Sequence, residues 1–521
     1  MHGRLRLIIA LIALALLWTP MAGAAAELRT LLILHTNDLH DHLRPGYDGL
    51  GGMPYVAGYV RQVRAERNDV LLLDAGDVME KGDMVAFLTQ SRLMYEAMSR
   101  IGYDATTVGN HDLAYGVDHL RKCAALAADM ALLCLNYLRP DGTRHFDASR
   151  VFMVNDVRVG VIGMTIPKGG ELMTPETAGD ALQEEAVHLK EDAHLVVALC
   201  HFSTRECAAM SARAPAVDVF IAGHSHEITR DPIRLENTGA LVTQAGYYAR
   251  YVGRLELVVD LDARRIADAK GQIVDMRHDA VPCDEALLAW VREQEAAIAP
   301  DASRIVARAD RSLNGKAAAI LAAAALRRQT GADIAFCHPG QIIRSGLPAG
   351  ELDVNAFFRT GGQRGKKIVA VTLTGRQIEA YLGGLVTWRY GNTEWSGFHA
   401  TLRRGPDGNG WSAQTDLESD RAYRVVMPEL EWRTRYHKVF ERIVRAGGAT
   451  AADLPKPSPL DITFTEAVTA YLEEVLDGDA PLDAHVRALA QGIGEEDEIA
   501  ETTSNADSRS NIEIEYAAIG E

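Results

Sequence analysis

The sequence predicts an α/β protein with a second, α+β domain, and three observations support this. Short apolar runs alternate with helical stretches over the first half of the chain. Each run ends abruptly in polar residues, and after about residue 284 a second region begins, with its own helices and strands. Alternating buried strands and helices are typical of layered α/β domains. Because 521 residues exceed what one hydrophobic core organises, two domains are expected.

Four apolar runs are predicted to be buried strands, each followed by a polar cluster. They are 31–34 before cluster 35–40, 70–73 before 74–77, 195–199 before 200–201, and 219–222 before 223–226. A fifth cluster, Gly109-Asn110-His111-Asp112, follows the apolar approach 105–108, and helices are expected at 56–67 and 84–100. Ligands in such folds gather beyond the carboxyl ends of the strands, so the clusters mark the candidate site.

The second region begins with a helix predicted at 285–298, with Asp284 as its N-cap and Pro300 beyond its end. Further helices are expected at 317–328 and 376–385, and strands at 333–337 and 368–373. The predicted organisation is a signal peptide (1–26), a catalytic domain (27–283), a linker helix (284–302), a C-terminal substrate domain (303–490) and an acidic disordered tail (491–521).

The N-terminus has the pattern of a secretory signal peptide. Arg4 and Arg6 precede the apolar run 7–18, and small residues follow at 22–26. The run is shorter than the roughly 20 residues of a bilayer span, so cleavage is favoured over an uncleaved anchor. We therefore expect a periplasmic or secreted protein without a stable membrane anchor. A net charge of −17 argues against nucleic-acid binding, which requires a basic surface.

The polar clusters contain side chains of the kinds that bind transition metals. Carboxylate, imidazole and amide groups suit Zn, Mn or Fe, and no cysteine set indicates a structural zinc site. One carboxylate can bridge two cations about 3.5–4 Å apart, and a water between them becomes a hydroxide nucleophile near neutral pH. The candidates are Asp38, His40, Asp77, Asn110, His111, His201, His224 and His226.

These five blocks, in this order, resemble the signature of the calcineurin-like metallophosphoesterases. A longer resemblance, over about 28–485, is to the exported bacterial 5′-nucleotidase family, through 34–40 in the first domain and 330–334, 343–350 and 373–378 in the second. It implies a four-layer sandwich, two mixed sheets flanked by helices, that binds two divalent ions. The implied ligands are Asp38, His40 and His226 for one ion and Asn110, His201 and His224 for the other, with Asp77 bridging and His111 as general acid.

Two departures from the family pattern bear on function. Relatives often carry Asp or Asn where Ala114 stands, to orient the catalytic histidine. Either another group accepts the imidazole N–H of His111, or this histidine is less well poised. In the second domain the family's Asn-Gly-Gly-Gly-x-Arg block becomes 338–344, and an aromatic block is missing near 428–432. Arg344 and Arg359 are the candidates for holding an anionic group of the substrate.

The leading prediction is a metal-dependent phosphohydrolase that removes phosphate from nucleotides or related small phosphoesters through a metal-bridging hydroxide. Related alternatives are a 2′,3′-cyclic nucleotide phosphodiesterase/3′-nucleotidase and a sulfate thiohydrolase-like enzyme of sulfur oxidation. The latter ranks lower because such enzymes usually alter the block that is intact at Gly109-Asn110-His111-Asp112. The non-enzymatic alternative is a surface binding protein that keeps the scaffold with weak turnover.

Overall fold

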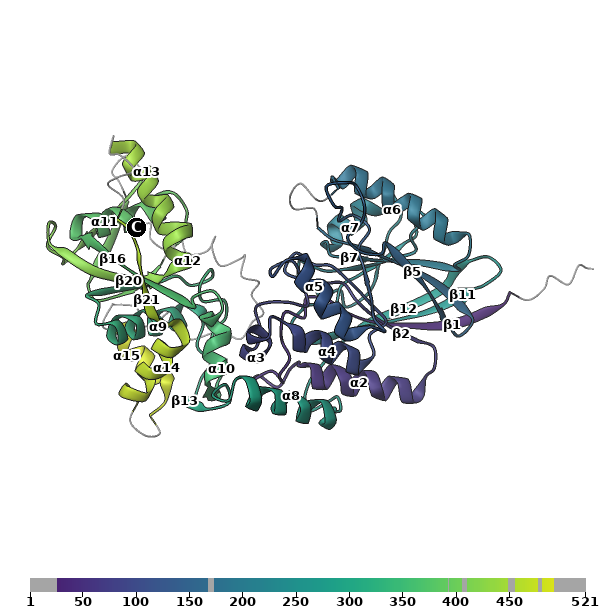
Figure 1. Cartoon of the computed structure of the whole chain (residues 1–521), viewed down its shortest axis with the longest axis horizontal. Helices are drawn as coiled ribbons and strands as arrows, with labels where there is room; N and C mark the ends of the chain where they lie inside the picture. Colours follow the sequence, from purple (N-terminus) through teal and green to yellow (C-terminus); the bar gives the residue numbers. More distant parts are fainter. Residues whose placement is uncertain are drawn as a thin grey trace, which may run out of the picture.

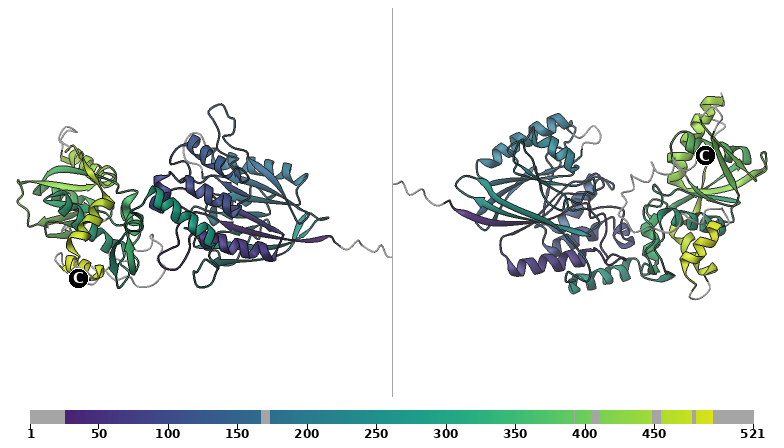
Figure 2. Two further views of the ribbon diagram at one scale, coloured as in Figure 1. Left: turned by 60° about the horizontal axis from the view of Figure 1, so that its bottom comes forward. Right: turned by 180° about the vertical axis from the view of Figure 1, so that it is seen from behind.

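The computed structural model describes residues 26–166, 173–391, 393–404, 410–447, 455–476 and 480–491. The described chain forms two lobes (Figures 1 and 2). The predicted signal peptide, apart from its last residue, and the predicted tail beyond residue 491 lie outside the described residues. Within the described part, no helix combines the length and apolar character needed to cross a bilayer.

The first domain is built on two six-stranded sheets. One has the order β12-β11-β1-β2-β3-β4 and the other β5-β6-β7-β8-β10-β9. The first consists of β1 (Leu28–Thr36), β2 (Val70–Asp74), β3 (Ala105–Thr107), β4 (Ala131–Leu133), β11 (Tyr251–Asp260) and β12 (Arg265–Asp275). The second consists of β5 (Ser149–Val154), β6 (Val157–Met164), β7 (Leu195–Cys200), β8 (Val219–Ala222), β9 (Ile233–Arg234) and β10 (Leu241–Thr243). Both are mixed, because parallel strands are flanked by antiparallel ones.

Apolar side chains from both sheets meet in one buried layer. Ile33 and Leu73 of the first sheet pack there with Val197 and Ile221 of the second. The outer face of the first sheet is covered by α2 (Met53–Glu66), α4 (Arg92–Ile101) and α5 (Val117–Ala124), and that of the second by α6 (Pro175–Lys190) and α7 (Thr204–Ser211) (Figure 1). The predicted four-layer sandwich is thereby confirmed.

The single helix predicted at 84–100 is wrong. The structure contains two helices, α3 (Met84–Leu88) and α4, which are separated by Gln90 and Ser91 in the left-handed region with φ of 51° and 65°. The apolar spacing continues across the break, so periodicity alone did not reveal it. The break turns α4 onto the sheet, where Leu93, Met94 and Met98 are buried.

Helix α8 (Glu285–Ile298) follows the first domain and packs against it. Its N-cap is Asp284, whose side chain accepts a hydrogen bond from Leu287 N. Leu287 and Val291 are buried in the same apolar cluster as α2. The helix therefore belongs physically to the first domain and carries the chain to the second (Figure 1).

The second domain contains a five-stranded sheet in the order β17-β14-β20-β16-β21. Its strands are β14 (Ile334–Cys337), β16 (Lys367–Thr374), β17 (Glu394–Ser396), β20 (Ala422–Pro428) and β21 (Ser458–Thr463). One face is covered by α9 (Gly315–Thr330), α14 (Phe464–Val475) and α15 (Leu482–Gln491), the other by α11 (Gly375–Thr387) and α13 (His437–Gly447). Two pairs lie outside the sheet: β13 (Ile305–Ala309) with β15 (Gly350–Asp353), and β18 (Ala400–Arg404) with β19 (Trp411–Thr415).

Charged and polar side chains connect the two domains. Arg44 Nη2 lies 2.7 Å from Asp353 Oδ2, and Tyr47 donates to the same carboxylate. The Asn355 amide donates to Asp83 Oδ1 over 2.8 Å and accepts from Met84 N over 2.7 Å. These contacts lie beside α10 (Val354–Phe357) and place the second domain against the loops of the first.

Candidate dimetal centre and interdomain cavity

The candidate ligands sit on tightly bent loops at the strand ends. Asp38, His40, Asp77, His224 and His226 all lie in the left-handed region, with φ between 48° and 69°. Non-glycine residues seldom adopt this conformation, and they concentrate at functional sites where the surrounding structure enforces it. At each of these bends the side chain points toward one of two groups of potential metal ligands.

The first ligand group consists of Asp38, His40 and His226. One potential ligand atom from each lies within 4.8 Å of the others. His226 Nε2 is 3.2 Å from Asp38 Oδ1 and 3.3 Å from His40 Nε2. Two imidazole nitrogens and a carboxylate oxygen that face each other at this distance suit a single cation.

The second group consists of Asp77, His201 and His224, which also lie within 4.8 Å of one another. His201 Nε2 is 3.1 Å from Asp77 Oδ2, and the same oxygen is 3.6 Å from His40 Nε2 of the first group. Asp77 therefore reaches both groups, as a bridging carboxylate must.

The donor chemistry of the centre fits divalent transition metals. Although Asp38 Oδ1 and His201 Nε2 lie close to other ligand atoms, they and Asn110 Oδ1 are buried and make no hydrogen bond of suitable geometry within the described part of the chain. Buried polar atoms are normally satisfied, so three of them together indicate a ligand. Although burial lowers it, the pKa of His201 rises to about 10, because Asp77 and Asp38 stabilise positive charge there.

Neighbouring groups fix the orientation of the ligands. His40 Nδ1 is 3.1 Å from Met79 O and His201 Nδ1 is 2.9 Å from Ala75 O, so each ring presents Nε2 to the centre. Asp112 accepts hydrogen bonds from the backbone N–H groups of Gly109, Asp77, Val78 and Met79. Asp112 therefore ties the loop that carries Asn110 to the loop that carries Asp77.

Gly109 lies at a close approach of two loops. A Cβ at this position would come within 2.1 Å of Asp77 Oδ1. Any side chain at 109 would displace the carboxylate that reaches both ligand groups, so the site requires glycine before Asn110.

His111 lies beside the ligands, and its partner comes from a different loop. Its ring centroid is 5.1 Å from that of His40, and its backbone N–H donates to Asp77 Oδ1 over 2.7 Å. His111 Nδ1 is 2.6 Å from Glu80 Oε2. Glu80 therefore supplies the carboxylate that Ala114 cannot. Of the two alternatives raised by Ala114, the structure supports the one in which another group accepts the imidazole N–H of His111.

One lysine lies at the centre, and two arginines of the second domain are close enough to influence its pKa. Lys81 Nζ lies 3.1 Å from His40 Nε2. Burial lowers the pKa of Lys81 to about 8, and repulsion from Arg344 and Arg364 acts in the same direction. Burial, together with repulsion from Arg364, lowers the pKa of Arg344 to about 10. Sequence reasoning proposed Arg344 but missed Lys81 and Arg364.

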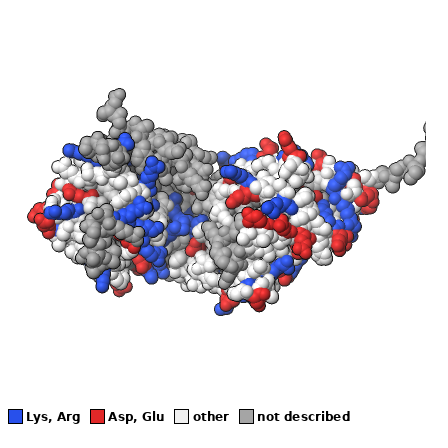
Figure 3. Space-filling view, turned by 90° about the horizontal axis from the view of Figure 1, so that it is seen from above, with Lys and Arg blue, Asp and Glu red and all other residues white. Residues whose placement is uncertain are grey.

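Within the described residues, Arg344 and Arg364 have no ion pair within 4.0 Å. Figure 3 shows basic side chains gathered along the hollow between the two domains. Two half-buried guanidinium groups without carboxylate partners can receive an anion between them.

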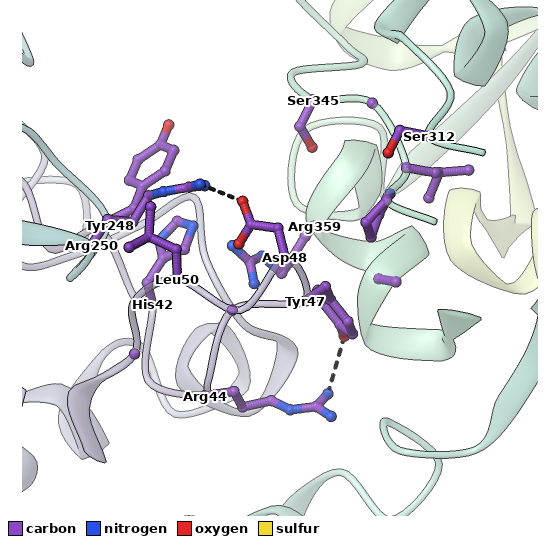
Figure 4. Close-up of a pocket in the computed structure, with 16 residues that line it drawn as sticks. His42, Arg44, Tyr47, Asp48, Leu50, Tyr248, Arg250, Ser312, Ser345 and Arg359 are labelled. Atoms are coloured by element: carbon purple, nitrogen blue, oxygen red, sulfur yellow. Dashed lines mark hydrogen bonds and ion pairs between the residues drawn. The ribbon is translucent and has the colours of Figure 1, made fainter. Parts of the chain in front are cut away.

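Arg359, the other proposed anion contact, lies in a cavity of about 260 Å³ between the domains (Figure 4). Its Nη1 is 3.8 Å from Asp83 Oδ1, and its guanidinium lies 5.5 Å from the centroid of the Tyr47 ring. Arg250 lines the same cavity and is paired with Asp48. The cavity arginines are thus engaged with groups of the protein itself, unlike Arg344 and Arg364.

The cavity and the metal centre share a wall. Tyr248 stacks on His42 with ring centroids 3.9 Å apart and lies 5.7 Å from the His40 ring and 5.6 Å from the His226 ring. A molecule in the cavity would therefore contact Tyr248 and His42, and Tyr248 in turn contacts two ligands of the first group.

Comparison with known proteins agrees with this geometry. A profile of the calcineurin-like phosphoesterase family matches residues 31–227, and one of the 5′-nucleotidase C-terminal domain matches residues 296–430. The 5′-nucleotidase of Vibrio vulnificus is 24% identical over 89% of this chain and 93% of that protein. Endonuclease YhcR of Bacillus subtilis is 26% identical over 55% of this chain, and the matched region makes up only 26% of the length of that protein.

Solved structures share the fold over most of the chain. The 5′-nucleotidase precursor of Thermus thermophilus superimposes with a TM-score of 0.66 at 22% identity, covering 87% of this chain and 99% of that one. Sulfate thiohydrolase SoxB of Thermus thermophilus gives 0.61 at 16% identity, covering 87% and 96%. Identities this low establish the fold only.

A metal-binding sandwich joined to a separate α+β domain defines a two-domain metallophosphoesterase. The chain belongs to the calcineurin-like phosphoesterases with a 5′-nucleotidase C-terminal domain. It is thus a metal-dependent phosphoesterase, as the sequence predicted.

Proposed function

We propose that this chain is an exported phosphohydrolase that releases phosphate from nucleotides or related small phosphoesters. The observation that carries the proposal is the juxtaposition of two ligand groups, a histidine and unpaired arginines. The ligand groups and His111 come from the first domain, and Arg344 and Arg364 from the second. A phosphate between them would meet the reacting groups on one side and guanidinium donors on the other.

The chain's own residues support hydrolysis in defined ways. Two divalent ions, when bound, would supply Lewis-acid activation of the phosphate and of the attacking water. Asp38, His40 and His226 would hold one ion, and Asn110, His201 and His224 the other, with Asp77 shared. The ions are of the Zn, Mn or Fe type, because imidazole and carboxylate ligands suit these metals.

His111 would donate a proton to the leaving oxygen, since it lies next to the ligands and its Nδ1 is engaged by Glu80. Lys81, Arg344 and Arg364 would offset the negative charge of the phosphate. Nucleotides are favoured as substrates because the curated relatives that match along most of the chain are named 5′-nucleotidases. The 24% identity to one of them supports the substrate class, not a particular nucleotide.

The test is product formation by the metal-reconstituted protein on a substrate panel, measured as phosphate released from the monoesters, nucleoside monophosphate formed from the cyclic nucleotides and UDP-sugars, and sulfate released from the thiosulfonates. The panel contains nucleoside 5′- and 3′-monophosphates, 2′,3′-cyclic nucleotides, UDP-sugars, p-nitrophenyl phosphate and thiosulfonates. Turnover of 5′-monophosphates is the expected result. Preference for cyclic nucleotides or thiosulfonates would support the corresponding alternative, and two bound ions without any turnover would support a binding protein.

Export is tested separately. Mass spectrometry of the native protein should show a start after about Ala24 or Ala26, because small residues there complete the signal-peptide pattern. An intact Met1 or His2 start would contradict it.

A further inference from the structure

We propose that Glu80 positions His111 for proton donation, and that it does so from a loop held by both domains. The proposal rests on the proposed phosphohydrolase function, since it assigns a residue to that reaction. The short contact between His111 Nδ1 and Glu80 Oε2, 2.6 Å, is the observation that carries it.

The contact fixes the tautomer of His111. A carboxylate accepts but does not donate when ionised, so Nδ1 carries the hydrogen and Nε2 faces the substrate. The pKa of Glu80 is lowered although burial acts to raise it, because the His111 contact and the nearby Arg364 and Arg344 stabilise its negative charge. In the reaction, the Nε2 proton of protonated His111 moves to the leaving oxygen, and Glu80 keeps the ring oriented without being protonated itself.

The backbone around Glu80 is constrained on both sides. Glu80 and Lys81 lie in the left-handed region, with φ of 66° and 79°. Glu80 N donates to Asp41 Oδ2 of the first domain over 3.0 Å, and Lys81 N donates to Gln363 Oε1 of the second over 2.6 Å. Gln363 is therefore a second positioning residue, and the second domain contributes to the orientation of the histidine as well as to the arginines.

An alternative role for Glu80 is to neutralise Arg344 and Arg364 without influencing His111. The two roles predict different kinetics. Loss of a positioning group should lower kcat for substrates whose leaving group needs a proton. Loss of a charge partner for the arginines should change KM for every substrate alike.

The first experiment compares Glu80→Ala with wild type on a nucleoside 5′-monophosphate and on p-nitrophenyl phosphate, whose leaving group needs little protonation. We expect kcat for the nucleotide to fall about 10- to 100-fold, the range for loss of an orienting partner, with a much smaller loss on p-nitrophenyl phosphate. Glu236→Ala, at an exposed carboxylate of the same domain, is the control. Equal losses on both substrates, or a change in KM alone, would overturn the proposal.

The second experiment is a double-mutant cycle with His111→Ala. If Glu80 acts through His111, Glu80→Ala should cost little further activity once the imidazole is gone. Additive losses would refute the assignment. Glu80→Gln keeps the size of the side chain and one acceptor oxygen, so its kcat should lie between those of wild type and Glu80→Ala. It replaces Glu80→Ala in the cycle if the alanine variant does not fold.

The third experiment does not depend on turnover, so it separates this proposal from the proposed function. Nitrogen-15 NMR of the metal-free protein should show His111 with its proton on Nδ1 in the wild type and a mixture of tautomers in Glu80→Ala. Gln363→Ala should shift the same signals to a smaller extent. Identical His111 signals in wild type and Glu80→Ala would overturn the positioning role even if the enzyme hydrolyses phosphoesters.

Discussion

The two domains hold their functional side chains in different ways. In the first domain the candidate ligands are buried or half-buried, and backbone carbonyls or N–H groups fix their rings and carboxylates. In the second domain Arg344 and Arg364 are half-buried, and the described part of the chain offers them no carboxylate within ion-pair distance. The residues that would bind the metals are thus held in place by backbone hydrogen bonds. The arginines that would bind the substrate have no such carboxylate partner and are available to an anion. Substitutions of the first-domain ligands should therefore lower metal content and kcat, whereas substitutions of the second-domain arginines should raise KM.

The largest effect is expected for Asp77→Ala, which removes the carboxylate shared by both ligand groups. Metal content should fall for both ions, and kcat should fall by more than the roughly 100-fold that loss of an outer-shell partner can cost. Elemental analysis with steady-state kinetics measures this, with Asp268→Ala at an exposed position as control. Full metal content in Asp77→Ala would show that the carboxylate does not bridge.

Arg344→Ala and Arg364→Ala test the recognition side. Each removes hydrogen bonds to a charged group, which are worth about 1.5–3 kcal/mol, so KM should rise roughly 10- to 100-fold while metal content stays unchanged. Arg376→Ala is a matched control, because that arginine is exposed in the same domain. If kcat fell and KM did not change, the arginines would belong to the rigid, chemical part of the site.

Metal removal should destabilise the first domain selectively, since three buried atoms without hydrogen-bond partners, Asp38 Oδ1, Asn110 Oδ1 and His201 Nε2, lie at the candidate centre of that domain. At a metal concentration about 100-fold above Kd, binding contributes about 2.7 kcal/mol. This corresponds to a Tm increase of about 5–10 °C for a domain of this size. Calorimetry with and without chelator measures it, and hydrogen exchange should increase in the five ligand loops. Loss of protection across the second domain as well would argue that the two regions are not independent.

A smaller effect concerns a buried acid of the second domain. Burial raises the pKa of Glu431 to about 7 from 4.5, although Thr393 and Arg435 favour its charged form. Between these values the unfolded chain has lost the proton that the folded chain keeps, so stability falls as the pH rises from about 4.5 to about 7. Glu431→Gln should flatten this dependence and raise Tm at pH 8 relative to wild type. An unchanged profile in thermal melts from pH 5 to 8 would show that Glu431 stays charged when folded.

The sequence predicted buried strands and placed the ligand clusters at their ends, where ligands gather in layered α/β folds, and the family resemblance added the two mixed sheets. It did not predict the partner of His111. Glu80 and Lys81 resemble an exposed charged pair, and only their left-handed backbone turns them inward. Arg364 was missed for a similar reason, since it follows the π-helical turn Phe358–Gly362, which no apolar periodicity marks. Arg344 was found because it stands within a recognisable block.

The left-handed backbone beneath five of the candidate ligands has a consequence for directed evolution. Glycine at Asp38, His40, Asp77, His224 or His226 would relieve local strain, because it adopts φ values of 48–69° without steric cost. A library challenged by heat in the presence of a chelator would therefore enrich glycine at these positions and lose the metal centre first. Selecting for turnover together with heat resistance would keep the strained residues in place and move the accepted substitutions into the second domain.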